Sequence, residues 1–309
     1  MYDSVIVKAK ALLKNFRQNY ELYLFVLLPL IYVVIFCYVP MYGVQIAFRK
    51  FDSALGITGS PWVGFAQFKR FFNSYQFSQV LKNTLGISFY QLAASFPAPI
   101  ILALMLNEVA HRKFKKFTQT VTYAPYFIST VTVTGMILIF LSPRSGIIPM
   151  FLQTVGIKPQ LYIAEPSWFK TIYVVSGVWQ ATGFASILYI AALSSVDPAL
   201  YESAMIDGVS KLKKIFYIDL PVLRPTIVIM LILSFGSLMS VGFEKVFLLQ
   251  NDLNLSSSEV ISTYTYKIGL QGGQFSYSAA IGLFNSAINF VMLVAVNFIA
   301  RRLGESSLW

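Results

Sequence analysis

The chain has 309 residues, of which 56% are hydrophobic and only 12% charged, and its formal net charge is +11. Soluble domains carry a charge on about a quarter of their residues, so this composition excludes an ordinary soluble globule. The positive charge lies in short loops between apolar runs, which favours membrane topology over nucleic-acid binding as its cause. With one histidine and one cysteine, the chain has no internal disulfide and no thiolate metal centre.

The first 21 residues predict a basic amphipathic helix. Lys8, Lys10, Lys14 and Arg17 alternate there with apolar residues at helical spacing. Such a helix suits the anionic surface of a membrane, and docking on a partner subunit is the alternative. The apolar run that follows is too long for a cleavable signal peptide.

Six apolar runs reach or approach the ~20 residues needed to cross ~30 Å of hydrocarbon. We therefore predict an all-α integral membrane protein, with residues 22–309 forming one domain of six transmembrane helices. The runs lie at about 22–47, 83–107, 117–141, 171–196, 225–243 and 278–300.

Two of the connecting segments have a composition of their own. Residues 48–79 are rich in aromatic side chains with Arg and Lys between them, which suits either an interfacial aromatic belt or contact with a protein partner. Residues 142–167 contain several prolines and glycines and predict a structured turn or a short re-entrant piece.

The distribution of basic residues predicts the orientation. The N-terminal tail, the loops after the second and fourth runs, and the C-terminus are all basic, whereas the opposite side carries fewer charges, four of them in its first loop. The positive-inside rule then places both termini and the loop after the fourth run in the cytoplasm. The loop and C-terminal charges are Arg112, Lys113, Lys115, Lys116, Lys211, Lys213, Lys214, Arg301 and Arg302.

The loop at 197–221 is the longest polar interruption in the second half of the chain. Asp197 can cap a helix that starts at Pro198, and Gly208 can end it in the left-handed conformation. A basic turn follows, and Leu220-Pro221 and Pro225 are expected to break the chain before the next apolar run. The spacing fits a docking element for a partner and equally an ordinary solvated loop.

At this point the sequence resembles a known family. Glu202-Ser203-Ala204, Asp207-Gly208 and Ile218-Asp219-Leu220-Pro221 are similar to the EAA loop of the permease subunits of bacterial binding-protein-dependent ABC importers, with Ser203 in place of the second small residue. Two further stretches, PMYGVQIAFRKF and SPWVGFAQFKRFF, resemble the branch that imports oligosaccharides.

The resemblance implies a type I ABC importer permease fold in the bacterial cytoplasmic membrane. It implies a path for a carbohydrate, in oligosaccharide form, that an extracytoplasmic solute-binding protein delivers. It also implies a second homologous permease subunit and two ATPase subunits that hold ATP and Mg, so that this chain needs no cofactor of its own. The implied ATPase-coupling residues are Tyr201, Glu202, Ser203, Ala204, Asp207, Gly208, Leu220 and Pro221.

Polar and aromatic residues within the last three runs are candidates for the substrate path. Polar groups in a bilayer usually face the interior of the helix bundle, and a sugar needs apolar ring faces together with hydrogen-bonding groups. Hydrogen bonding between helices is the alternative role, especially for the serines. The candidates are Ser176, Gln180, Phe184, Ser237, Ser240, Phe243, Glu244, Asn285 and Asn289.

Two other classes of protein predict different sequence features. A stand-alone secondary transporter or channel predicts inverted repeats and ion-coupling carboxylates in mid-span, and only Glu244 comes near the membrane. A membrane enzyme needs a catalytic cluster, which the single His111 does not make. The sequence contains no P-loop, HExxH, CxxC or GxSxG motif, so we expect no enzyme activity in this chain.

Overall fold

The computed structural model describes residues 18–156, 158 and 160–309, and its named elements are all helices. Within this part of the chain, β-structure is limited to two isolated bridges, Arg49 to Trp62 and Asp52 to Gly56. The predicted all-α fold is therefore confirmed. The amphipathic helix expected over residues 1–21 lies mostly outside the described residues. The described residues divide into two units, one ending at Gln67 and the other running from Phe68 to Trp309.

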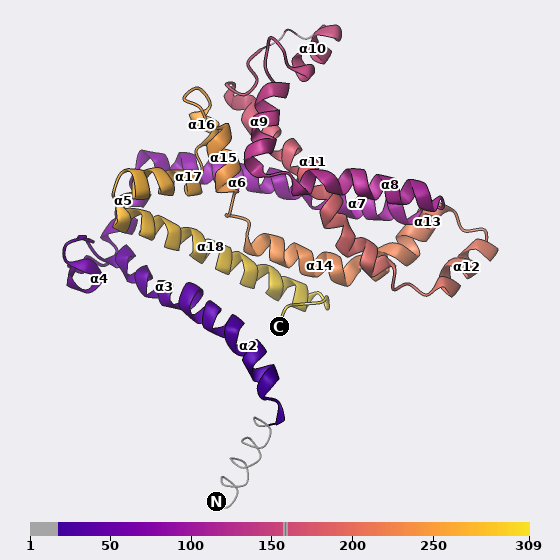
Figure 1. The fold of residues 1–309 in the computed structure, drawn as a ribbon, viewed down its shortest axis with the longest axis horizontal. Coiled ribbons are helices and arrows are strands. Elements are labelled where there is room, and N and C mark those ends of the chain that lie inside the picture. The colour runs from indigo at the N-terminus through magenta and orange to yellow at the C-terminus, as the bar shows by residue number, and fades with distance from the viewer. Residues whose placement is uncertain (1–17, 157, 159) are drawn as a thin grey trace, which may run out of the picture. The chain divides into compact units, whose positions relative to one another are not determined.

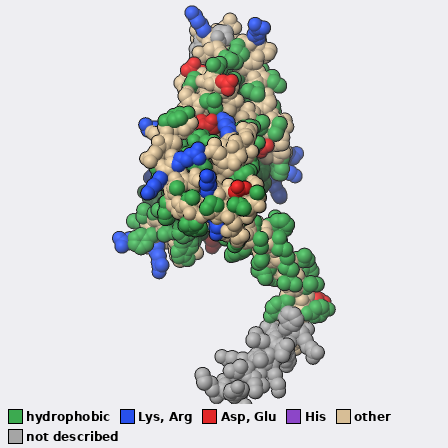
Figure 2. Space-filling model, turned by 90° about the vertical axis from the view of Figure 1, so that its left-hand side faces the viewer, with side chains coloured by type: hydrophobic (Ala, Val, Ile, Leu, Met, Phe, Trp, Pro, Cys, Tyr) green, Lys and Arg blue, Asp and Glu red, His purple; other side chains and the backbone are tan. Residues whose placement is uncertain are grey.

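The first unit contains one long apolar helix that covers the predicted run 22–47. It consists of α2 (Tyr20–Val33), a π-helical turn η1 (Val34–Tyr38), α3 (Val39–Met41) and a 3-10 segment η2 (Tyr42–Phe48). The wide turn comes directly before Pro40, whose missing N–H interrupts regular α-helical bonding. Hydrophobic side chains cover this helix and are exposed on it (Figure 2).

A compact hook follows this helix and contains the short helix α4 (Gly56–Gly59). The Arg49 guanidinium donates hydrogen bonds to the carbonyls of Thr58 and Ser60, at 3.0 and 2.7 Å. The ring of Trp62 stacks on that of Phe48, with centroids 5.6 Å apart. Some of the aromatic side chains in residues 48–79 therefore pack against one another and stabilise this segment.

Four long helical stretches build the second unit (Figure 1). They are α6 (Tyr75–Ser95) continued by α7 (Pro97–Asn107), α11 (Pro166–Leu193), α14 (Leu220–Gly236) and α18 (Phe275–Arg302). Helix α11 packs against α6, α7 and α14, and α14 packs against α18. These stretches and the first-unit helix are the five helices of the described chain that are long and apolar enough to cross a membrane.

Helix α6 begins eight residues before the predicted run 83–107. Its first turns are too polar for lipid, but they are packed on protein. The side chains of Gln79 and Asn83 donate hydrogen bonds to backbone carbonyls between Leu255 and Glu259, and the hydroxyl of Thr84 accepts one from the N–H of Ile261. These bonds tie α6 to the short helices α16 (Leu255–Ser258) and α17 (Ile261–Tyr266).

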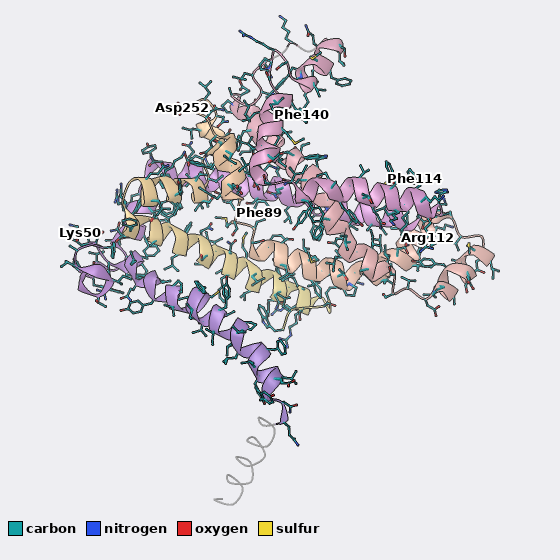
Figure 3. All side chains as sticks on the ribbon, in the orientation of Figure 1. Lys50, Phe89, Arg112, Phe114, Phe140 and Asp252 are labelled. Atoms are coloured by element: carbon teal, nitrogen blue, oxygen red, sulfur yellow. The ribbon has the colours of Figure 1, made fainter. Side chains whose placement is uncertain are left out.

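The run predicted at 117–141 is not one continuous helix. It divides into α8 (Arg112–Tyr123), η3 (Ala124–Phe127) and α9 (Thr130–Phe140), and the two parts meet at an angle of 100°. Pro125 tightens the chain into a 3-10 turn, and Ser129 starts a new helix by accepting the N–H of Thr132 at 3.2 Å. Figure 3 shows Arg112 and Phe114 at the far end of α8 and Phe140 on α9, across this bend.

The connection at 142–167 contains a short helix, α10 (Ile147–Thr154), and residues 157 and 159 in it lie outside the described residues. After the loop that begins at Asp197, the expected break at Leu220-Pro221 and Pro225 is wrong. Residues Lys211–Gly236 run as one helix through α13 (Lys211–Lys214), the π turn η4 (Ile215–Asp219) and α14. The helix continues because the π turn η4 widens it directly before α14, which accommodates the missing N–H of Pro221 without a break.

The run predicted at 225–243 ends early, since α14 stops at Gly236. A non-helical turn follows and leads into α15 (Phe243–Leu249). The amide of Asn289 on α18 holds this turn: its Oδ1 accepts the N–H of Met239 at 2.8 Å, and its Nδ2 donates to the Ser240 hydroxyl at 3.0 Å. A side chain from a distant helix thus supplies the partners that a longer α14 would have had. The remaining named elements are α5 (Ala66–Phe72), α12 (Pro198–Ile206) and η5 (Lys267–Gln271).

Candidate functional site

Helix α12 (Pro198–Ile206) forms a short, well-capped projection from one end of α11 and α14 (Figure 1). Asp197 accepts the N–H of Ala199 at 2.9 Å, as the sequence predicts for a helix cap. Gly208 has φ of 68°, and the N–H groups of Gly208 and Val209 donate to the carbonyls of Met205 and Ala204. This pair of bonds is a Schellman motif, which fixes the direction in which the chain leaves the helix.

One side of α12 is presented to the surroundings. Glu202, Ser203 and Asp207 are exposed, and so are the apolar side chains of Met205 and Ile206, at 70% and 86%. Ala204, the last of the three EAA-like residues, is buried at 8% exposure. An acidic group beside bare apolar side chains at the tip of a projection is suited to contact with another protein.

A polar cluster inside the chain anchors the other side of α12. The Tyr201 hydroxyl donates to Oδ1 of Asp219 at 2.6 Å, and Asp219 is completely buried at the end of η4. Asn107, at the end of α7, donates weakly to both groups, at 3.3 and 3.4 Å. Burial, reinforced by the bond to Asp219, raises the pKa of Tyr201 to about 12, so this hydroxyl keeps its proton.

An ion pair lies next to this cluster. Nζ of Lys214 on α13 is 2.6 Å from the Glu108 carboxylate and 5.1 Å from the centre of the Tyr201 ring. The projection is therefore connected to the ends of α7 and α14 by the hydrogen bonds of Tyr201, Asp219 and Asn107 and by the ion pair beside them. Of the remaining predicted coupling residues, Leu220 and Pro221 start α14 and do not share the exposed face of α12.

Two cavities lie between the long helices of the second unit. Cavity A, of about 630 Å³, is lined by residues of α6, η3, α11 and α15. Cavity B, of about 650 Å³, is lined by α6, α7, α11, α14 and the turn after α14. Gln91 and Ala181 line both, so the two cavities adjoin each other.

Cavity A combines aromatic rings with polar groups. Tyr126, Phe127, Tyr173 and Phe243 provide rings, and the polar lining residues are Gln91, Ser129, Thr130, Gln180, Glu244 and Lys245. The Gln180 amide donates to the carbonyl of Ile128 at 3.1 Å, which fixes its orientation and ties α11 to the bend between α8 and α9. Its amide oxygen remains an acceptor at the cavity wall.

Cavity B is lined by hydroxyl groups and rings. Ser88, Ser95, Ser234, Ser237 and Ser240 contribute hydroxyls, and Phe96, Phe184 and Tyr189 contribute rings. Phe184 stacks face to face on Tyr126 of cavity A, with centroids 4.0 Å apart. The stacked pair forms a continuous aromatic surface from one cavity to the other.

Most of the predicted path residues line these two cavities, and three do not. Gln180, Phe243 and Glu244 line cavity A, and Phe184, Ser237 and Ser240 line cavity B. Ser176 instead lines a third, apolar cavity of about 460 Å³ beside Trp168 and Trp179, and its hydroxyl donates to carbonyls of its own helix. Asn289 holds the turn after α14, and the buried Oδ1 of Asn285 has no hydrogen-bond partner among the described residues.

Several residues in these places were not singled out from the sequence. Asp219 belongs to the EAA-like pattern but was not among the predicted coupling residues, and Asn107 stands at a helix end with no periodic pattern to mark it. Gln91, Tyr126 and Tyr173 belong to helices whose lining face becomes visible only in the fold. Among the residues that were missed, Lys245 could have been singled out from the sequence. It lies within the apolar stretch 241–249, and a lysine is rarely buried unless it is paired.

Comparison with known proteins points to one family. The family model for the binding-protein-dependent transport system inner membrane component matches residues 95–305. The polygalacturonan/rhamnogalacturonan transport system permease protein YteP of Bacillus subtilis is 40% identical, over 99% of this chain and 97% of its own. Protein LplB of the same organism is 38% identical, over 95% of this chain and 92% of its own.

Solved structures match over the same length. A bacterial ABC transporter involved in the import of the acidic polysaccharide alginate contains a chain that is 40% identical and superposes with a TM-score of 0.87, covering 94% of this chain and 98% of that chain. A bacterial alginate ABC transporter in complex with an alginate pentasaccharide-bound periplasmic protein matches with the same TM-score at 38% identity, covering 96% and 99%. The ABC importer permease fold implied by the EAA-like loop is confirmed, and the chain belongs to the inner-membrane permease components of binding-protein-dependent transport systems.

Proposed function

We propose that this chain is the transmembrane subunit of an ATP-driven importer and forms the path of an oligosaccharide through the membrane. The observation that carries the proposal is the pair of adjoining cavities A and B, whose rings, amides and hydroxyls are the groups that a sugar requires. Two of the similar proteins, the polygalacturonan/rhamnogalacturonan permease YteP and the alginate transporter, support the same substrate class.

The exposed side of α12 is proposed to contact a separate ATPase subunit. Glu202 would meet a basic group there, and Met205 and Ile206 would supply buried apolar area. ATP and Mg would be held by that subunit, since this chain carries no phosphate-binding motif. Motion of the ATPase would reach α7 and α14 through Tyr201, Asp219 and Asn107, which join α12 to both helices.

The complete importer would contain two permease subunits, two ATPase subunits and an extracytoplasmic solute-binding protein. The exposed apolar surfaces of the long helices would be covered by lipid and by the second, homologous permease. The basic segments that start α8 and form α13 lie at the same end of the second unit, in support of a cytoplasmic position for that end in the bacterial cytoplasmic membrane (Figures 1 and 3).

Reconstitution tests the proposal directly. The permease, its homologous partner permease and the cognate ATPase are placed in liposomes with ATP inside, and the binding protein and a labelled oligosaccharide are added outside. We expect accumulation that stops when ATP, the ATPase or the binding protein is omitted. Accumulation that persists without ATP and follows an ion gradient would instead identify a secondary transporter.

A further inference from the structure

Lys245 is a buried cation at the wall of cavity A, and no acidic group in the described part of the chain pairs with it. The residue is 9% exposed, and its Nζ donates to the carbonyl of Tyr173 at 3.3 Å. Nζ also lies 5.2 Å from the centre of the Tyr173 ring. The ion pairs of the described residues join Lys214 to Glu108, Arg224 to Glu305 and Lys267 to Glu259, and none includes Lys245.

This arrangement leaves the ammonium group incompletely satisfied. A lysine has three N–H donors, and one of them is used by a neutral carbonyl. A buried charge is costly unless it is paired and hydrogen-bonded. The neighbouring Glu244 does not supply the pair, because it is exposed and lies next to Lys245 along α15, so that the two side chains leave the helix in different directions.

The ammonium group borders the cavity. Gly177 lines cavity A, and a Cβ atom at this position would lie 3.6 Å from Nζ of Lys245. Because glycine carries no side chain, the space next to Nζ belongs to the cavity. Glu244 and Lys245 are the only charged residues among the described ones that line cavities A and B, so Lys245 is the sole positive group along this stretch.

We propose that Lys245 binds a carboxylate of the saccharide in cavity A, and that this chain therefore selects acidic oligosaccharides built from sugar acids over neutral ones. The inference rests on the proposed carbohydrate function and names the charge of its substrate. The rings of Tyr126, Phe127 and Phe243 would contact the sugar faces while Lys245 takes the acid group.

The test compares an acidic saccharide with a neutral one of the same size. The probes are a labelled galacturonate trisaccharide and its methyl ester, and the protein is the purified permease–ATPase complex. Equilibrium dialysis without the binding protein measures the affinity of the complex for each probe, and uptake into liposomes with the binding protein is measured in parallel. A charge-assisted hydrogen bond is worth about a 10- to 100-fold difference in affinity, so the wild-type complex should bind the acid at least ~10-fold more tightly than the ester.

Three variants make the result specific. Lys245→Met keeps the length and apolar stem of the side chain and should abolish the preference, whereas Lys245→Arg keeps the charge and should retain it. Glu244→Gln, at an exposed position, should strengthen binding of the acid by about 2- to 5-fold through removal of a like charge. This last variant keeps the proposal testable even when Lys245→Met fails to assemble.

The outcomes separate the two proposals. Equal affinity of the wild type for acid and ester, or an unchanged preference in Lys245→Met, would overturn the role of Lys245 and leave carbohydrate import standing. An unchanged or weaker affinity for the acid in Glu244→Gln would also count against it. If a complex that hydrolyses ATP takes up neither saccharide, the proposed carbohydrate import is itself contradicted.

Discussion

Tyr201 links the exposed helix α12 to the buried carboxylate of Asp219, and the link is made by its hydroxyl group. Replacing Tyr201 with Phe removes the 2.6 Å bond and leaves Oδ1 of Asp219 with only the weak donor Asn107. Loss of a hydrogen bond to a buried charged group costs about 1–3 kcal/mol. We expect Tyr201→Phe to lower the thermal unfolding temperature of the purified complex and the amount of sugar imported per ATP hydrolysed.

The matched control is Tyr217→Phe, which removes the same hydroxyl from an exposed ring one turn before α14. It should leave both quantities unchanged. Equal behaviour of the two variants would mean that Tyr201 does not connect α12 to the spans.

Two of the asparagines of α18, Asn285 and Asn289, are predicted to differ. Asn289 bonds to Met239 and Ser240 and holds the turn that ends α14, so Asn289→Ala should destabilise the protein by about 1–3 kcal/mol and reduce the yield of assembled complex. Asn285 has a buried oxygen without a partner in the described structure, so Asn285→Ala should leave stability unchanged or higher. Thermal unfolding of the two purified variants decides this, and a reversed order would contradict the roles assigned to them.

The polar residues of the spans show where sequence reasoning ends. Helical spacing singled out Gln180, Phe184 and Ser237, which line the cavities. The same spacing could not show that the hydroxyls of Ser176 and Ser237 bond to their own helices or that Asn289 bonds to another segment. Periodicity gives the face of a helix, but the partner of a side chain depends on which element packs against that face.

At the scale of elements, the conformation of Gly208 determines how α12 is presented. Its φ of 68° is strained for any residue with a Cβ atom, by about 1–2 kcal/mol, and more for a β-branched one. We expect Gly208→Val to fold and insert but to lose sugar uptake, because the chain leaves α12 in a new direction. The control is Gly282→Ala, within α18, where a Cβ meets nothing within 4 Å and φ is not positive. Wild-type uptake by Gly208→Val would show that the direction of the loop is unimportant.

The helices themselves were largely predictable, and their interruptions were not. Long apolar runs marked α2 to η2, α11 and α18 to within a few residues, because lipid-facing composition is a local property. The 100° bend before α9 and the end of α14 depend on a serine cap and on an asparagine from another helix. The positions of the prolines did not mark the helix ends reliably. Pro125 accompanies a break, whereas Pro221 and Pro225 lie within a continuous helix.

At the scale of the whole molecule, the basic ends of the helices predict the orientation in the membrane. Lys213 is exposed on α13 and is predicted to face the cytoplasm. A cysteine introduced at Lys213 should therefore be protected from membrane-impermeant thiol reagents in intact cells and should react after lysis. Cys37 is exposed, so the experiment needs a Cys37→Ala background. Rapid labelling in intact cells would reverse the orientation.

ATP hydrolysed by another subunit is proposed to drive transport through this chain by way of α12. The most direct measurement is Glu202→Lys, followed by co-purification of the ATPase and uptake of labelled oligosaccharide in the same membranes. Truncating or reversing one partner of a desolvated charge pair costs about 2–5 kcal/mol, so the ATPase should dissociate and uptake should cease, while the variant still inserts in the membrane. Asp252→Lys, an exposed charge reversal in the turn after α15, should leave the ATPase bound (Figure 3). Wild-type co-purification and uptake in Glu202→Lys would contradict the claim.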